Sequence, residues 1–365
     1  MTSSADIRID EYMRDRLMPV EGAIPHVPGI EMYGDSTPAE TAGGDLFEYI
    51  NFQQRYDIDA RIQKALQASQ DILTPLAPSG PSCNPGDPYL EWLKSQPEYR
   101  PEMESSYRKA RSLEQVRVAE NLKGLYSTAG VLLVDAQGHG LISAKIASTV
   151  HDTFHALMLS ELDHYGTTTP ELFENINVRL AHSVTARNAL GGTGLGDARE
   201  IATMLYGEVH PSGQFRFVNF GHPPPLLYSA RTQKFTEIDI ERMVQFLPLG
   251  VEVAENHPDR KRYTSMRFRQ SPADCTNIAE ITLINPGDIL FLYTDGVYDG
   301  SDRQARLEIE ELMRANCQLP AKEICAALMR YAFNRDQRLR DRGEADTIDD
   351  KTVFIIKRSD TAPES

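Results

Sequence analysis

Four acidic positions in this sequence share one pattern: a carboxylate at the end of a short apolar stretch, most often beside a glycine. A run such as 289–293 between turn residues predicts a buried strand. A strand fixes the carboxylate next to it, and a glycine lets backbone or a metal ion come close. One such position is typical of an Asp-Gly turn, but four indicate an oxygen-ligand site for Mg²⁺ or Mn²⁺. The four positions are Asp45, Asp135, Asp295 and the pair Asp349 and Asp350.

The chemistry of such a site follows from its charge. Carboxylates that converge without a counter-ion repel one another and raise one another's pKa. Two divalent ions remove this repulsion, produce a hydroxide at neutral pH and stabilise both ends of an in-line displacement. This is the usual machinery for phosphoester hydrolysis, so the acidic positions predict a two-metal hydrolase centre.

Apolar periodicity predicts the elements that must position these carboxylates. A helical block at 53–127 separates two of the strands, and it either recognises a partner or is an inert surface excursion. A short amphipathic helix is expected at 7–17. The expected strands are 30–34, 46–52, 131–134, 202–209, 215–219, 225–228, 281–284, 289–293 and 352–357, and the other helices are 141–162, 170–184, 307–316 and 321–334.

Composition excludes several classes of protein. The 365 residues are 41% hydrophobic and 25% charged, and the formal net charge is −15. That charge argues against nucleic acid and against an anionic membrane surface as partners. The four cysteines form no CxxC pair, and the polar N-terminus is unlike a signal peptide. A cytoplasmic protein with reduced thiols is expected.

Six segments follow one another along the sequence in this order: AGGDLFEYINF, VDAQGHG, NFGHPPPLLY, LPLG, GDILFLYTDGVYDG and DDKTVFIIK. Together they resemble the SpoIIE-type branch of the metal-dependent type 2C protein serine/threonine phosphatases. The resemblance implies an α+β fold, a four-layer α/β/β/α sandwich of two antiparallel sheets flanked by helices. It further implies a linker helix at 1–27, a phosphatase domain at 28–358 with a helical insertion at about 53–127, and a disordered tail at 359–365.

The resemblance also implies ligands for two Mn²⁺ or Mg²⁺ ions. Asp135 matches the carboxylate that bridges both ions, and Ala136 matches the position that offers its backbone carbonyl. Asp295 and Asp349 match the ligands of the second ion. Asp350 is the alternative to Asp349, which is preferred.

Further positions carry over by the same comparison. Asp45 matches the acidic position after paired glycines, a ligand either direct or through water. His139 would be a general acid for the leaving serine oxygen or, alternatively, a residue that shapes its loop. Candidates for the rim of the substrate site are Gly221, His222 and Gly250.

The function implied by the resemblance is hydrolysis of phosphoserine or phosphothreonine on a protein, such as an anti-sigma-factor antagonist. The attacking group is metal-bound hydroxide, and no phosphoenzyme forms. An alternative is a catalytically weak scaffold that binds a regulatory partner through the helical insertion. A homodimer formed by the N-terminal helix and the insertion is a separate hypothesis.

Three other motifs support competing interpretations. His151 and His155 stand four apart on a helix, as in the H-E-x-x-H zinc proteases. Asp152 replaces the glutamate and no third ligand is evident, so surface or partly packed histidines are favoured. The glycine-rich segment 191–196 lacks the Gly-Lys-Ser/Thr ending of a phosphate loop and predicts a plain loop. The mixed-charge cluster 335–342 predicts a solvated surface.

Overall fold

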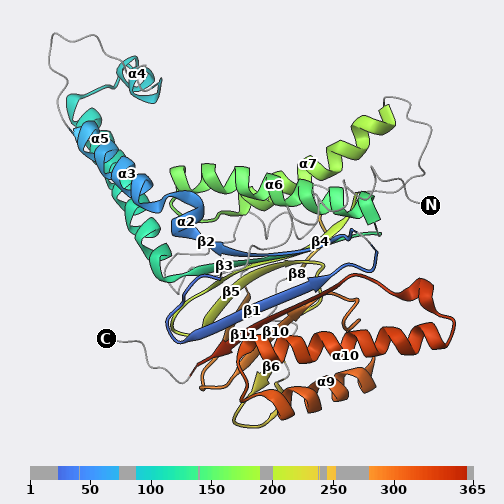
Figure 1. Ribbon diagram of the computed structural model, residues 1–365. Coiled ribbons are helices and arrows are strands. Elements are labelled where there is room, and N and C mark those ends of the chain that lie inside the picture. The colour runs from blue at the N-terminus through green and yellow to red at the C-terminus, as the bar shows by residue number, and fades with distance from the viewer. Residues whose placement is uncertain are drawn as a thin grey trace.

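The protein is a sandwich of two sheets that lie face to face, with helices on both outer faces (Figure 1). This arrangement confirms the α+β, four-layer fold that the sequence predicts. The computed structural model describes residues 24–40, 42–73, 88–138, 140–189, 200–236, 238, 245–251 and 279–359. The predicted helix at 7–17 and the glycine-rich segment 191–196 lie outside these residues.

The first sheet is antiparallel throughout and has the strand order β1-β11-β10-β6-β7. Its side chains alternate between two cores, as the pleat of a strand requires. Leu290 and Ile356 face the other sheet, whereas Phe291 and Ile355 face the helices α9 (Arg303–Asn316) and α10 (Ala321–Asp341). The strands are β1 (Ile30–Thr37), β11 (Lys351–Arg358), β10 (Ile289–Tyr293), β6 (Leu226–Ser229) and β7 (Lys234–Thr236).

The second sheet has the order β2-β3-β4-β5-β8, and β9 also pairs with β5. The two-residue strand β8 pairs with β5 in parallel, so this sheet is antiparallel except at this edge. The helices α6 (Gly140–His164) and α7 (Pro170–Ala189) cover its outer face (Figure 1). The strands are β2 (Asp45–Asn51), β3 (Ala129–Ala136), β4 (Ala202–Val209), β5 (Gln214–Phe220), β8 (Gln245–Phe246) and β9 (Ala279–Thr282).

Strand β2 shows how the pleat sorts functional side chains. Phe47 and Tyr49 pack between the sheets, whereas Leu46 and Ile50 pack against the helix layer. Odd-numbered residues of β2 therefore face the inter-sheet core, and even-numbered residues face α6. This alternation sends the side chain of Asp45 to one face of the sheet and that of Glu48 to the other.

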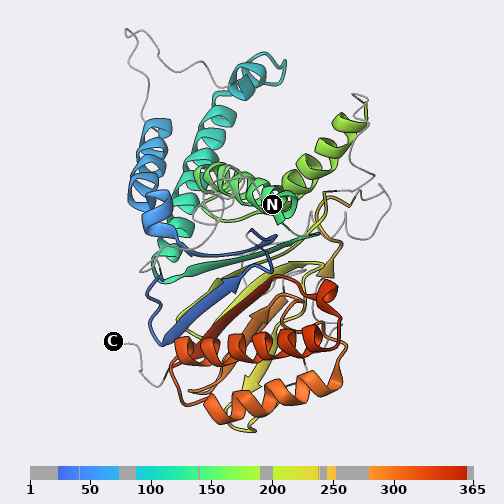
Figure 2. The same cartoon turned by 45° about the vertical axis from the view of Figure 1, so that its right-hand side comes forward.

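The described residues between β2 and β3 are largely helical, whereas residues 74–87 lie outside the described part of the chain. The described residues form α2 (Phe52–Tyr56), α3 (Ile58–Leu73), α4 (Pro88–Lys94), α5 (Pro101–Lys123) and a short 3-10 turn (Gly124–Ser127). Helices α3 and α5 lie side by side and project away from the sandwich, with α4 at the far end (Figure 2). A hydrogen bond of 2.7 Å between the buried Ser69 and Ser112 hydroxyls connects the two helices.

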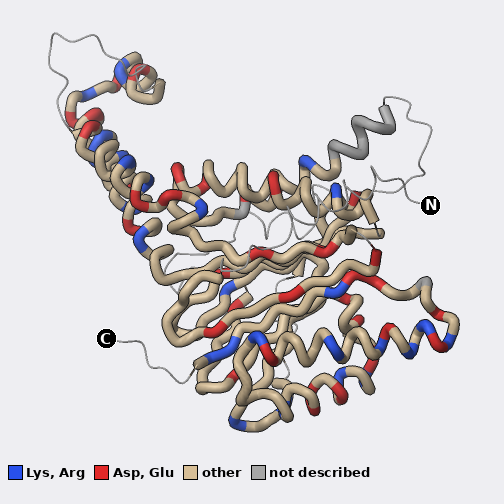
Figure 3. The backbone as a smooth tube through the Cα atoms, in the orientation of Figure 1, with Lys and Arg blue, Asp and Glu red and all other residues tan. Residues whose placement is uncertain are grey.

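Charged residues of both signs are interspersed along α5, α9 and α10 (Figure 3), an arrangement typical of solvated helix faces. No helix in the described part of the chain is long and apolar enough to cross a membrane. One charged segment departs from the prediction. Helix α10 continues through the cluster 335–342 as far as Asp341, and Asp336 within it is only 4% exposed.

Candidate metal centre at the end of the sandwich

Strand pairing brings the predicted acidic positions to one end of the sandwich. Asp45, the first residue of β2, lies directly opposite Asp135 near the end of β3. In the other sheet, Thr294 N donates to Thr352 O, so the segment after β10 lies beside the start of β11. The last residues of two strands and the first residues of two others therefore meet.

Asp45 connects the two sheets. It is 9% exposed, and its Oδ2 lies 2.7 Å from Thr294 Oγ1 and 2.8 Å from Thr352 Oγ1. Because Thr352 belongs to β11 of the opposite sheet and Thr294 directly follows β10 of that sheet, this carboxylate is a buried bridge across the sandwich. Neither threonine was predicted from the sequence, although Thr294 directly precedes Asp295 and Thr352 lies two residues after Asp350.

Asp350 holds the loop that leads into β2. Its Oδ1 accepts from Ala39 N at 2.7 Å and its Oδ2 from Gly44 N at 2.6 Å. A Cβ on Gly43 would lie 2.4 Å from the same carboxylate, so only glycine fits there. Asp349, by contrast, is exposed, and its Oδ1 accepts only the 2.8 Å bond from Asp350 N among the described contacts. The two neighbouring acids thus have different surroundings.

Gly44 packs closely against the backbone of Ala136. A Cβ on Gly44 would lie 2.5 Å from the Ala136 carbonyl oxygen, and Ala136 N donates to Gly44 O at 3.2 Å. Gly296 is equally constrained, since a Cβ there would lie 1.9 Å from the carbonyl oxygen of Asp350. Glycine is needed at both positions for the close approach of backbone to backbone.

The electrostatics of this end of the sandwich are those of uncompensated carboxylates. Burial, then the charge of Asp295, raises the pKa of Asp135 to about 7. Burial and the charge of Asp135 raise the pKa of Asp45 well above its usual range. The pKa values of Asp295 and Asp350 are also raised, first by burial and in part by Asp349.

These side chains fit hard divalent cations. All the donors are oxygen atoms, and no described ion pair joins Asp135, Asp295 or Asp349 to a Lys or Arg side chain. Among the described residues, three ligand atoms come within 4.8 Å of one another only at Glu48, His151 and His155. No three of the aspartate carboxylates meet that spacing among the described residues.

We expect the metal-free protein to lose stability relative to Asp135→Asn as the pH rises from 5.5 to 8. The pKa of an aspartate is near 4 in the unfolded chain and that of Asp135 is about 7 in the fold, so ionisation is penalised increasingly up to about pH 7. The difference in unfolding free energy should change by about 2 kcal/mol. Urea denaturation in EDTA at the two pH values measures it.

The variant is the necessary control, because buried histidines titrate in the opposite direction. Burial lowers the pKa of His222 to about 3 and also lowers that of His155, so both destabilise the fold as the pH falls below about 6.5. Both proteins contain these histidines, so the contributions of the histidines cancel in the difference between the two unfolding free energies. A difference that stays constant between the two pH values contradicts the raised pKa.

The three rim candidates lie at the same end of the second sheet. Gly221 pairs with Met204, and Leu249, next to Gly250, exchanges backbone hydrogen bonds with Ala202, at the start of β4. His222 is only 1% exposed, and its Nδ1 lies 2.9 Å from Thr203 Oγ1. Its ring therefore lies beneath the surface, next to the residue that pairs with Asp135. His139 lies outside the described residues.

A buried ion pair between Lys351 and Asp336 lies next to the aspartates and was not predicted from the sequence. Lys351 is 2% exposed, and its Nζ lies 2.7 Å from Asp336 Oδ2 and donates to the Asp349 carbonyl oxygen at 2.5 Å. The prediction that the cluster 335–342 is solvated is wrong for Asp336, because this residue comes to lie against the start of β11. Another cluster member, Arg335, donates to the Val297 carbonyl at 2.9 Å.

One family of known proteins matches more than half of the chain. The family profile of stage II sporulation protein E (SpoIIE) matches residues 127–359. No curated protein matches the sequence. The RsbU and RsbW domains of a Mycobacterium tuberculosis protein are 18% identical with a TM-score of 0.47, and the match covers 94% of this chain and 65% of that one.

Two other solved structures show a similar relation. The phosphatase domain and a regulatory fragment of SpoIIE from Bacillus subtilis are 15% identical with a TM-score of 0.41, covering 63% of this chain and 54% of that one. The SiaA-PP2C domain of Pseudomonas aeruginosa is 12% identical with a TM-score of 0.47, covering 98% and 95%. The chain thus spans less than two thirds of the first two structures.

Proposed function

Because the chain belongs to the SpoIIE family, we propose that it is a protein serine/threonine phosphatase of the PP2C type, which removes phosphate from phosphoserine or phosphothreonine with the help of two divalent cations. The observation that carries the proposal is the set of uncompensated carboxylates at one end of the sandwich, with the pKa of Asp135 raised to about 7. Such a set is costly in a metal-free protein and useful in a metal-dependent one.

We assign the cations, Mn²⁺ or Mg²⁺, to the carboxylates of Asp135, Asp295 and Asp349 and to the Ala136 carbonyl. Two such ions would supply the Lewis acidity that activates water and neutralises phosphate charge. Asp350 and Asp45 act differently in this proposal. Asp350 holds the loop before β2 through Ala39 and Gly44, and Asp45, with one oxygen held by two threonines, acts through water.

The substrate is a phosphorylated protein. We propose an anti-sigma-factor antagonist in a cytoplasmic signalling pathway, the substrate that the resemblance to SpoIIE-type phosphatases implies. The net charge of −15 fits a protein partner better than a nucleic acid or an anionic membrane.

A scaffold that binds a partner through its helical region is the second candidate. One observation favours it: at the far end of the α3–α5 pair, Tyr89 and Trp92 are 50% and 53% exposed, and their rings lie 5.3 Å apart. Exposed aromatic residues are common at the centre of protein interfaces. The same surface would serve an active phosphatase as a substrate-recognition element.

Hydrolysis of phosphopeptides distinguishes an active phosphatase from a scaffold. We expect the protein with Mn²⁺ to release phosphate from phosphoserine and phosphothreonine peptides, and EDTA to abolish the release. A phosphotyrosine peptide of the same sequence is the matched control and should be hydrolysed much more slowly. If all three peptides stay intact while Mn²⁺ is bound, as measured by calorimetry, the scaffold replaces the phosphatase as the better proposal.

A further inference from the structure

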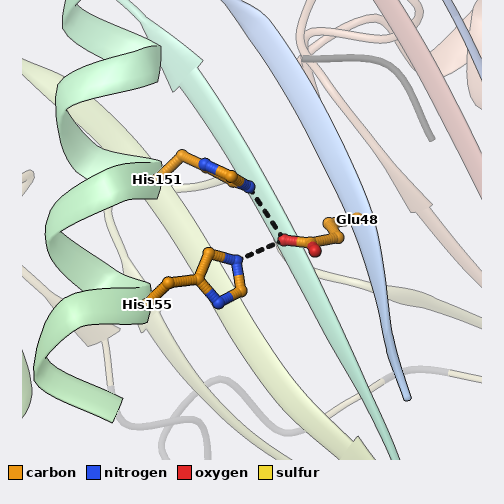
Figure 4. A group of neighbouring side chains, drawn as sticks. All are labelled: Glu48, His151 and His155. Atoms are coloured by element: carbon orange, nitrogen blue, oxygen red, sulfur yellow. Dashed lines mark hydrogen bonds and ion pairs between the residues drawn. The ribbon is translucent and has the colours of Figure 1, made fainter. Parts of the chain in front are cut away.

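A second cluster of metal-binding side chains lies on the outer face of the second sheet (Figure 4). His151 Nε2 and His155 Nε2, from successive turns of α6, lie 3.0 Å and 2.5 Å from the same oxygen, Glu48 Oε2 of β2. The histidines alone gave no evident third ligand in the sequence. The structure supplies one from a residue more than 100 positions earlier, and the prediction of surface or partly packed histidines misses this partner.

The other ring nitrogens are arranged as zinc ligands require. Zinc takes the lone pair of one imidazole nitrogen, so the opposite nitrogen must carry the ring proton and donate it to a partner. His155 Nδ1 lies 2.5 Å from Tyr56 Oη, and His151 Nδ1 lies 3.3 Å from Asp152 Oδ1. Each histidine therefore has a neighbour that can fix its orientation with Nε2 toward Glu48.

This cluster is separate from the aspartate centre. Glu48 lies on the face of β2 that packs against α6, whereas Asp45 faces the opposite sheet and contacts Thr294 and Thr352. The three side chains are 11–15% exposed, so they are enclosed but still reach solvent. A ligand bound here would not touch the aspartates.

We propose that Glu48, His151 and His155 form a zinc-binding site that connects strand β2 to helix α6. Two imidazole nitrogens and one carboxylate oxygen are a common ligand set for Zn²⁺, with water at the fourth position, whereas Mg²⁺ and Mn²⁺ prefer oxygen. Tetrahedral zinc bonds of about 2.0–2.1 Å separate ligand atoms by roughly 3.3 Å. The present contacts need to widen by less than about 1 Å.

Charge supports the same assignment. Burial would raise the pKa of Glu48, but hydrogen bonds from His151 and His155 outweigh it and lower the pKa to about 2. Burial lowers the pKa of His155. Zinc binding needs the ionised carboxylate and neutral imidazoles with the ring proton on Nδ1, so the protons that Nε2 donates to Glu48 must be released or move to Nδ1 when zinc binds.

Zinc bound at this site would affect the aspartate centre, because both elements that it connects begin there. Strand β2 begins with Asp45, and α6 begins four residues after Ala136. A zinc ion would connect the two elements that start at the aspartate centre. It would also approach the helical region, because Tyr56 belongs to α2 and Arg55 Nη1 lies 3.5 Å from Glu48 Oε1.

The test measures Zn²⁺ binding to the full chain in an Asp135→Asn background, which weakens competition from the aspartate centre and keeps the outcome independent of phosphatase activity. Competition with a chromophoric chelator should give one tight Zn²⁺ per chain. Adding His151→Gln should weaken binding at least about 100-fold, and Tyr56→Phe, which alters only the hydrogen-bonding neighbour, about 10- to 100-fold. X-ray absorption of the bound zinc should show two imidazole nitrogens.

Thermal unfolding shows whether a variant loses zinc binding only because it no longer folds. Zn²⁺ should raise the Tm of the Asp135→Asn protein and leave that of Asp135→Asn/His151→Gln unchanged, with the two Tm values similar in EDTA. Glu48→Gln is the second variant, should His151→Gln fold poorly. Zinc affinity that is unaffected by both substitutions, or absence of a tight Zn²⁺ in the background protein, overturns the proposal and leaves a hydrogen-bonded triad.

Discussion

Asp349→Asn is expected to lower kcat with Mn²⁺ by about 10³-fold or more and to raise the unfolding free energy of the metal-free protein slightly, because the charge of Asp349 repels Asp295 and Asp350. The carboxylate is exposed and its one described contact is an acceptor bond from Asp350 N, which the amide oxygen of asparagine retains. What the substitution removes is a charged ligand, and metal stabilisation of a phosphoryl transition state contributes several kcal/mol, at about 1.4 kcal/mol per factor of ten. Steady-state hydrolysis of a phosphoserine peptide and calorimetric titration with Mn²⁺ measure the two effects.

Asp350→Asn is the matched control one residue away. Asp350 uses both oxygens to accept from Ala39 N and Gly44 N, and an asparagine leaves one of these donors without an acceptor. That costs about 1–3 kcal/mol, partly offset by relief of the repulsion that raises its pKa. We expect lower stability with Mn²⁺ binding retained. Loss of Mn²⁺ binding in Asp350→Asn but not in Asp349→Asn would exchange the roles of the two acids.

The contrast between Asp349 and Asp350 shows which features can be predicted from the sequence and which cannot. The motif DDKT identifies both acids, and the turn signals around 289–293 place β10 within the same limits that the structure has. Those features are local: an apolar run, a glycine and an acid at its end. Which of two adjacent acids faces solvent depends on the loop before β2, about 306 residues away, and no local pattern contains that information.

The same reason explains the residues that were missed. Glu48 is an isolated acid in an apolar strand, and its importance arises only because α6 lies across that face of the sheet. Asp336 belongs to a run of charges that has the composition of a solvated helix face. Its burial follows from the packing of α10 on the first sheet, which brings it to Lys351. Long-range packing, in both cases, decides the role of an otherwise ordinary residue.

Lys351→Met is expected to give the largest loss of stability, about 3–5 kcal/mol, because it leaves Asp336 buried without its partner. Urea unfolding should be measured in EDTA, so that altered metal binding does not contribute. Lys351→Met/Asp336→Leu is the informative companion. Replacing a whole buried ion pair by apolar residues is often close to neutral, so the double variant should recover most of the loss.

Activity should not recover with stability. Lys351 Nζ also donates to the carbonyl oxygen of Asp349 at 2.5 Å, and a methionine offers no donor to hold that peptide in place. A displacement of about 1 Å in a catalytic site is worth roughly 10²-fold in rate. The double variant should therefore be stable, but its kcat should be about 10- to 100-fold lower than that of the unmodified protein. Full activity in the stable double variant would mean that Lys351 serves the fold alone, and that Asp349 is positioned by its bond to Asp350 and by the metal it binds.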